Sequence, residues 1–180
     1  ITGTGGGQGR AAALLFAREG ATVVGCDLKA DEAEETVALV RAAGGTMTSS
    51  SPLDLGDAAQ VTAWIDGVAA DHGRLDILYN NASAPKFDYL EDMTDADWRF
   101  TLRNELDLMF YACRAAWPHF RAAGGGVILN TASVQGSNAM PTRWGGVAHG
   151  TTKHGVIGNN YFDRTKGAIG KGDGRTAPRP

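Results

Sequence analysis

The glycine-rich segment at residues 2–9, Thr-Gly-Thr-Gly-Gly-Gly-Gln-Gly, most constrains the fold of this chain, because an apolar helical stretch follows it directly. Glycine has no Cβ atom and tolerates positive φ angles, so such a loop lets the backbone approach a bulky anion closely. The start of the following helix presents N–H groups and a partial positive charge to that anion. The segment therefore predicts a phosphate-binding turn and makes a nucleotide cofactor the first candidate ligand.

The spacing of the glycines fits one nucleotide-binding pattern and departs from two others. Gln8 stands at the sixth position from Gly3, where Gly-x-Gly-x-x-Gly requires glycine, and no Lys-Ser or Lys-Thr pair follows, as a P-loop requires. The segment instead fits Thr-Gly-x-x-x-Gly-x-Gly, with its fixed positions at Thr2, Gly3, Gly7 and Gly9. Such a turn alone is weak evidence for a nucleotide, but its position within a strand–helix–strand unit strengthens it.

Length and charge narrow the class of protein. The chain has 180 residues, enough for one α/β domain with a sizeable core. Its net charge of −3 gives a nucleic-acid partner no electrostatic support, and no apolar run approaches the ~18 residues of a membrane span. Cys26 and Cys113 lie in apolar segments without metal-type spacing, so we expect buried thiols, no metal site and a reducing, cytoplasmic location.

Apolar strands alternate with amphipathic helices along the chain. Continuous apolar runs predict strands at 21–27, 75–79 and 127–131, and a more polar run at 46–53 predicts another. This alternation implies a parallel sheet covered on both faces, and right-handed crossovers then give a doubly wound, Rossmann-type α/β fold. The helices are indicated by apolar residues at helical spacing: Ala30, Ala33, Val37 and Val40; Val61, Trp64, Ile65 and Val68; Leu106, Met109, Phe110, Cys113 and Trp117.

Two aspartates follow successive strands of this pattern. Asp27 ends a strand 18 residues after Gly9, where a carboxylate can accept both ribose hydroxyls of an adenosine and would repel a 2′-phosphate, which favours NAD over NADP. The alternative is an ordinary strand-terminal or helix-capping aspartate. Asp54, with Leu55 beside it, would bond the adenine amino group, or Asp54 would cap the helix that begins near Asp57.

Together with further motifs in the same order, these residues resemble the short-chain dehydrogenase/reductase family over about residues 1–158. Several ordered motifs are far more specific than any one of them. Ser83 stands where the family's Asn-Asn-Ala-Gly motif has glycine. The matching positions are Asn80-Asn81-Ala82 after the fourth strand, Asn104 in the long central helix, Ser133 after the fifth strand and Lys153 within 153–158.

The resemblance implies an NAD-dependent oxidoreductase that moves a hydride between nicotinamide and an alcohol or carbonyl carbon. The glycine-rich loop would hold the pyrophosphate, and Asn80 and Ala82 would line the cofactor groove. Ser133 would position the substrate oxygen. Lys153 would bond the nicotinamide ribose, and Asn104 would support a water relay.

The residue that exchanges the proton departs from the family's motif. The family's Tyr-x-x-x-Lys appears here with His149 four residues before Lys153, one helical turn away on the same face. Free imidazole titrates near pH ~6.5, and the positive charges of Lys153 and an oxidised nicotinamide disfavour imidazolium. We therefore expect a neutral His149 that acts as the general base in alcohol oxidation. The alternative is that His149 only fills the space and activity is lost or weak.

The resemblance also implies the surroundings of this site. The segment at 83–92, and the segment before His149 with Trp144 and the Gly145-Gly146 pair, would line the pocket for a small alcohol or carbonyl substrate. Family members commonly pair through the long central helix and the lysine-bearing helix, so we expect a homo-oligomer.

The two ends of the chain depart from the pattern. The chain starts at Ile1, directly before the glycine-rich segment, and residues 159–180 hold five Lys/Arg and two Asp among scattered Gly and Pro. We expect an NAD-binding domain at 1–158, an atypical disordered tail at 159–180, and a fold that is incomplete at both ends and marginally stable. A truncated or catalytically silent nucleotide-binding module is therefore the alternative function.

Overall fold

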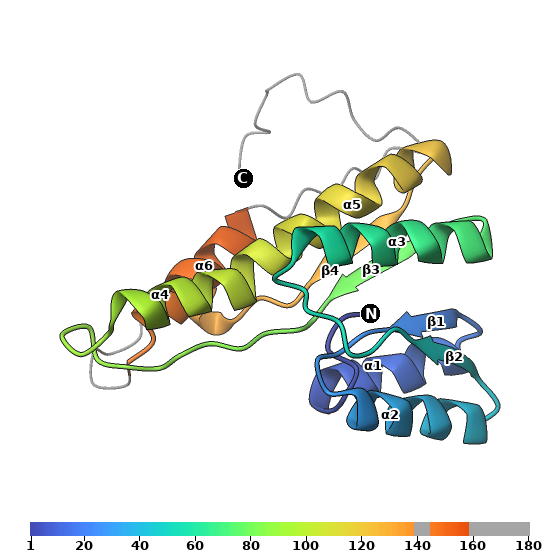
Figure 1. The fold of residues 1–180 in the computed structure, drawn as a ribbon, viewed down its shortest axis with the longest axis horizontal. Helices are drawn as coiled ribbons and strands as arrows, with labels where there is room; N and C mark the ends of the chain where they lie inside the picture. The colour runs from blue at the N-terminus through green and yellow to red at the C-terminus, as the bar shows by residue number, and fades with distance from the viewer. Residues whose placement is uncertain (139–144, 159–180) are drawn as a thin grey trace.

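The computed structural model describes residues 1–138 and 145–158, which form an α/β fold with parallel strands (Figure 1). The tail expected at 159–180 and the predicted pocket residue Trp144 lie outside the described residues. The elements are, in chain order, α1 (Gly7–Arg18), β1 (Thr22–Gly25), α2 (Ala30–Ala42), β2 (Thr46–Ser49), α3 (Ala58–His72), β3 (Ile77–Asn80), α4 (Asp95–Leu102), η1 (Arg103–Asp107), α5 (Leu108–Ala122), β4 (Val127–Asn130), η2 (Val134–Gly136) and α6 (Val147–Gly158).

The strands form two parallel pairs that the first residues of the chain join. β1 pairs with β2, and β3 pairs with β4. Between the pairs, Thr2 forms a parallel bridge with Cys26, and the Thr2 N–H donates to the Tyr79 carbonyl oxygen at 3.0 Å. The order across the sheet is therefore β2, β1, Thr2, β3 and β4, which confirms the predicted doubly wound, Rossmann-type fold.

Two apolar clusters hold the helices against the strands. α1 and α2 pack together against β1 and β2, while α3 and α5 lie side by side and α5 packs on β3 (Figure 1). None of the helices among the described residues is long and apolar enough to cross a membrane. Buried members of the first cluster include Ala13, Val23, Val37, Val40 and Met47, and those of the second include Ile65, Leu78, Leu108, Ala112 and Phe120.

The predicted long central helix consists of three continuous pieces. The five-residue π-helical turn η1 connects α4 to α5. A π-helical turn closes i→i+5 hydrogen bonds, so it holds one residue more than an α-helical turn and shifts the register of the side chains before it. Glu105 lies in this turn and is buried, with 2% of its surface exposed. The register shift therefore helps to determine which side chains of the long helix, Glu105 among them, face the interior.

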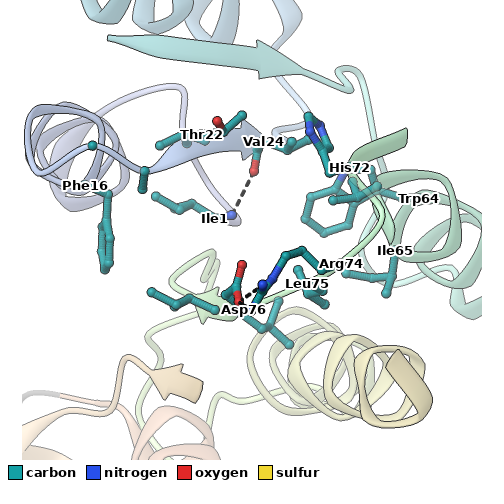
Figure 2. A pocket seen from close by; sticks show the side chains of 16 residues that line it. Ile1, Phe16, Thr22, Val24, Trp64, Ile65, His72, Arg74, Leu75 and Asp76 are labelled. Carbon is teal, nitrogen blue, oxygen red and sulfur yellow. Dashed lines mark hydrogen bonds and ion pairs between the residues drawn. The ribbon is translucent and has the colours of Figure 1, made fainter. Parts of the chain in front are cut away.

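A cavity of about 390 Å³ lies beside Ile1, between β1 and β3 (Figure 2). Its walls include Val24, Trp64 and Ile65, and the ion pair of Arg74 with Asp76 lies at one side. Because Thr22 and Ile77, which also line it, begin their strands, the cavity lies at the amino ends of the sheet. Doubly wound sheets bind ligands at the opposite, carboxyl ends of their strands, so we look for the functional site there.

Candidate functional site

A cleft of about 530 Å³ opens at the carboxyl ends of β1, β2 and β3. The glycine-rich loop forms one wall, and the segments that follow these three strands form the others. Gln8, Leu53 and Ala84 line the cleft although the sequence did not single them out for it, and so does Asn81 of the Asn-Asn-Ala motif. The lining residues that the sequence predicted as cofactor-binding are Gly3, Asp27, Asp54, Leu55 and Ala82; Asn104, expected to support a water relay, also lines the cleft.

The glycine-rich loop shapes this cleft through three different glycines. Gly3 has a φ of +73°, and a Cβ atom there would lie 2.9 Å from the Cα of Ala82. A Cβ on Gly9 would overlap the carbonyl oxygen of Gly3. At Gly6, by contrast, a Cβ would meet nothing within 4 Å, although Gly6 lines the cleft. Gly3 and Gly9 are therefore required by packing within the protein, and Gly6 keeps the cleft open.

The start of α1 faces the cleft without a side-chain cap. Gly6 is the cap residue, and no side chain accepts the N–H groups of the first turn. Gly7, with a φ of +50°, begins the helix. The first N–H groups of a helix have no partner within it, and together with the helix dipole they favour an anion at this end. The geometry is therefore suited to a phosphate or diphosphate group.

Asp27 lies at the edge of this loop. Its Oδ2 accepts a hydrogen bond from the Gly5 N–H at 2.8 Å, and its Oδ1 accepts one from the Lys29 N–H at 3.0 Å. Lys29, not Asp27, occupies the cap position of α2, so the helix-capping alternative for Asp27 is wrong. The carboxylate is thus held in the cleft wall by backbone N–H groups.

Two cations in this part of the structure, Lys29 and Arg10, are bound to other carboxylates. Lys29 Nζ lies 3.5 Å from Glu32 Oε1. Arg10 lies 2.7 Å from Glu35 Oε2, and its guanidinium also donates to the Gly5 carbonyl oxygen. The positive charges of Lys29 and Arg10 therefore each have an anionic partner already.

Asp54 is held by Arg103. The Arg103 Nη2 donates to Asp54 Oδ2 at 2.6 Å, and the Gly56 N–H donates to Oδ1 at 2.9 Å. The hydrogen bond from Arg103 is the main cause that lowers the pKa of Asp54 below its ordinary value of 3.8. The alternative that Asp54 caps the next helix is wrong, because Asp57 caps α3 with its own carboxylate. Asp54 and the buried Leu55 line the cleft.

The Asn-Asn-Ala turn is anchored by Thr2. The buried Thr2 Oγ1 accepts hydrogen bonds from the N–H groups of Asn81 at 2.9 Å and Ala82 at 3.0 Å. Asn80 is also buried, and its Nδ2 donates to Asn130 Oδ1 at 2.8 Å. Thr2 and Asn80 thus support the cleft from behind, while Asn81 and Ala82 form its surface.

Helix α6 carries His149 and Lys153, and both contact the buried Glu105. His149 Nδ1 lies 2.9 Å from Glu105 Oε1 and 2.8 Å from Oε2, and Lys153 Nζ lies 3.6 Å from Oε1. Thr152 Oγ1 donates to Glu105 Oε2 at 2.6 Å, and Ser83 Oγ donates to Oε1. Both carboxylate oxygens therefore have polar partners within the protein. We call these five side chains the Glu105 cluster.

Asn104, which the sequence predicted as a catalytic residue beside Ser133, His149 and Lys153, donates a hydrogen bond within its own helix. Its Nδ2 donates to the Phe100 carbonyl oxygen one turn earlier in the helix, at 2.8 Å, and it lines the cofactor cleft. Its neighbour Glu105 instead contacts His149 and Lys153, and sequence reasoning missed it. A signal was present, because Glu105 continues the buried stripe of the long helix through Leu108, Ala112 and Ala115 at helical spacing. A charged residue in such a stripe needs a buried partner.

Ser133 lies on the segment packed against α6. It is the cap residue of η2, and its Oγ accepts a hydrogen bond from the Gln135 N–H at 3.2 Å. Lys153 Nζ donates to the Thr131 carbonyl oxygen at 3.2 Å, two residues before Ser133. These contacts bring the end of β4 and the lysine of α6 together.

A second cavity, of about 690 Å³, lies beside the start of α6. Both segments predicted to line a substrate pocket reach it, one through Leu90 and Glu91 and the other through Gly145 and Gly146. The first segment also touches the histidine, since the rings of Phe87 and His149 lie 5.3 Å apart. The structure thus brings these two segments together, with Phe87 beside His149, whereas Ser133, His149 and Lys153 are not among the residues that line this cavity.

Comparisons with known proteins agree with this fold. A family model described as short chain dehydrogenase matches residues 1–160. The chain is 36% identical over 158 residues to D-threitol dehydrogenase of Mycolicibacterium smegmatis, covering 88% of this chain and 59% of that protein. It is 32% identical over 159 residues to cyclohexanol dehydrogenase of Acinetobacter sp., covering 88% of this chain and 62% of that protein. The chain thus spans about three fifths of the length of these relatives.

Solved structures show the same likeness. Carveol dehydrogenase from Mycobacterium avium in complex with NAD has a TM-score of 0.81 and 28% identity, covering 88% of this chain and 61% of its own. A metagenomic short-chain oxidoreductase in complex with NADP has a TM-score of 0.81 and 32% identity, covering 88% of this chain and 69% of its own. With a family model matched over most of its residues, this chain belongs to the short-chain dehydrogenase/reductase family.

Proposed function

We propose that this chain is the cofactor-binding part of an NAD-dependent dehydrogenase that converts an alcohol to a carbonyl compound or the reverse. Its relatives named above are dehydrogenases, and its structural neighbours include an NAD complex and an NADP complex. The observation that carries the proposal is the glycine-walled cleft at the uncapped start of α1, with Asp27 held at its edge.

The residues of the cleft fit a dinucleotide. Gly6 and the first turn of α1 would hold the diphosphate, because open space at Gly6 lets backbone N–H groups approach it. Asp27 would bind the adenosine ribose, with Asp54 and Leu55 at the adenine and Ala82 along the groove. Lys153 would hold the nicotinamide ribose. When bound, the nicotinamide supplies the carbon that accepts or donates the hydride.

The charges around Asp27 favour NAD over NADP. The carboxylate would repel a 2′-phosphate, and the positive charges of Lys29 and Arg10 already pair with Glu32 and Glu35. A 2′-phosphate would therefore meet a negative group without a free cation from either residue to offset it.

His149 is proposed as the proton acceptor and Ser133 as the group that positions the substrate oxygen. In the oxidation direction, the alcohol O–H bond breaks and an N–H bond forms on the imidazole. The substrate would be a small alcohol or its carbonyl counterpart, placed by Ser133 and His149; these two residues are not among those that line the cavity of about 690 Å³ beside α6. We further propose that the whole protein acts as a homo-oligomer.

Calorimetric titration of the full-length protein with NADH and with NADPH tests the cofactor. We expect NADH to bind at least about tenfold more tightly, which corresponds to about 1.4 kcal/mol. Asp27→Asn should narrow the difference in affinity between NADH and NADPH. Asp31→Asn, which changes an exposed aspartate of α2, should leave this difference unchanged. Absence of heat with either cofactor would refute the proposal.

Turnover separates an enzyme from a silent binding module. A panel of alcohols with NAD should give a rate that His149→Ala lowers by about 100-fold. Binding of NADH without turnover of any alcohol or carbonyl compound would make the chain a nucleotide-binding module instead. A His149→Ala variant with full turnover would show that another group accepts the proton.

A further inference from the structure

We infer that Glu105 is the positioning residue of a Glu105–His149 pair, which fixes the imidazole tautomer and leaves Nε2 to exchange the substrate proton. The inference rests on the proposed function, because it gives His149 a proton to move. It adds a residue that neither the motifs nor the matched family description assigns to the reaction.

The geometry of the pair determines which nitrogen carries the proton. His149 Nδ1 lies 2.8 and 2.9 Å from the two oxygens of Glu105. An ionised carboxylate only accepts hydrogen bonds, so Nδ1 must be the protonated nitrogen. Within the part of the chain that the structure describes, the hydrogen bonds of the His149 ring are made by Nδ1. Nε2 then holds the lone pair of a neutral ring and is the atom able to take a proton.

Burial makes the pair rigid. The Glu105 side chain has no exposed surface and that of His149 has 13%. The carboxylate is held by Ser83, Thr152 and Lys153 on its remaining sides. A histidine oriented by a buried and fully hydrogen-bonded carboxylate loses little freedom when a substrate arrives.

The Glu105 cluster also contains both residues, Ser83 and His149, that differ from the family's motifs. Ser83 stands where the family has glycine, and His149 stands where it has tyrosine. The two are distant in sequence, yet both contact the same carboxylate. If histidine had replaced tyrosine by chance, there would be no reason to find a buried carboxylate, Glu105, on its ring nitrogen. There would also be no reason for the Ser83 hydroxyl to bind this same carboxylate.

The charge of Glu105 complements the proton transfer. When Nε2 takes the alcohol proton, the ring becomes an imidazolium whose positive charge lies beside the carboxylate. Lys153 supplies a second positive charge 3.6 Å from the same carboxylate. Glu105 is a negative neighbour of His149 that the sequence-based expectation did not include. The pair therefore stabilises the state that follows proton transfer, as a buried aspartate does for histidine in a serine-protease triad.

Kinetics of the full-length protein test the role of Glu105. Glu105→Gln keeps the size of the side chain and removes its charge. We expect kcat to fall by about 100-fold, while Glu34→Gln, which changes an exposed glutamate of α2, should leave kcat unchanged. The double variant Glu105→Gln/His149→Ala should be no slower than His149→Ala, because Glu105 acts through His149. Wild-type kcat in Glu105→Gln, or losses that multiply in the double variant, would overturn the inference.

Nitrogen-15 NMR of labelled histidine gives a readout that does not need turnover. We expect the His149 ring, assigned by its loss in His149→Ala, to carry its proton on Nδ1, and we expect these shifts to change in Glu105→Gln. A proton on Nε2 with a bare Nδ1 would overturn the inference. If the wild-type protein turns over no alcohol, the proposed function fails, and the nitrogen shifts still decide whether Glu105 sets the tautomer.

Discussion

Arg103 Nη2 lies 2.6 Å from Asp54 Oδ2, and this ion pair ties the segment after β2 to the π-helical turn that carries Glu105. Asp54 lines the cofactor cleft, and Glu105 contacts His149. A single contact thus connects the proposed adenine end of the cleft to the helix that supports the proposed proton acceptor.

The Asp54–Arg103 pair predicts a pH-dependent loss of stability. Because Arg103 lowers the pKa of Asp54 below 3.8, the pair stabilises the fold fully above that pH, and the contribution is lost as the pH falls through the lowered value. Both side chains are partly exposed, so we expect about 0.5–1 kcal/mol. Urea unfolding of wild type and Asp54→Asn should differ by this amount near neutral pH and converge in acid. A difference that stays constant into acid would contradict the prediction.

Thr2 predicts a second effect on stability. Its buried Oγ1 accepts two backbone N–H groups, and Thr2→Val leaves both without this acceptor. We expect the free energy of unfolding to fall by about 2 kcal/mol, measured by denaturant titration. Thr2→Ser keeps the oxygen and should lose less. Equal stability of the valine variant and wild type would show that the hydroxyl does not anchor the Asn81–Ala82 turn.

The same substitution at two glycines separates binding from stability. A Cβ at Gly6 or at Gly67 meets nothing within 4 Å, but Gly6 lines the cleft and Gly67 lies inside α3. Gly6→Ala should weaken NADH binding by about tenfold or more with little change in stability. Gly67→Ala should raise the free energy of unfolding by about 0.5–1 kcal/mol and leave binding unchanged. Undiminished NADH affinity in Gly6→Ala would place the diphosphate elsewhere.

The two cysteines should differ in reactivity. Burial raises the pKa of the Cys26 thiol to about 12, against an ordinary 9.0, so its thiolate population in mild alkali falls by roughly 10³-fold. Cys113 is less buried, although burial raises its pKa too. In single-thiol variants Cys113→Ser and Cys26→Ser, a thiol reagent should label Cys26 more slowly than Cys113 in the folded protein. Equal labelling rates of the two thiols, measured at denaturant concentrations too low to unfold the protein, would contradict this order.

The fold was predictable because its strands carry a strong local signal. The apolar runs at 21–27 and 127–131 contain β1 and β4, and the run at 75–79 overlaps β3, which begins at Ile77 and ends one residue later, at Asn80. The polar run at 46–53 contains β2, where Met47 alone is buried and Thr46 and Thr48 are exposed. Its strand conformation depends on pairing with β1, which local composition only weakly indicates.

The contacts within the candidate site were less predictable. Asn104 and Glu105 are neighbours in sequence, and a regular helix through them gives no reason to expect a π-helical turn that brings Glu105 to His149. Asp54 and Arg103 are 49 residues apart, so their pairing comes from the tertiary fold. Residue types and spacing therefore indicated the loop, Asp27 and the lysine-bearing helix, while the partners of each polar group required the structure.

The π-helical turn has a consequence for how such enzymes can diverge. Deleting a single residue from Arg103–Asp107 would rotate α4 by about 100° relative to α5 and present a different side chain to α6. The packing of α5 on α3 would stay intact, since it lies beyond the turn. One codon gained or lost at this point is thus enough to exchange the neighbour of the proposed proton acceptor, His149, while the packing of α5 on α3 is kept.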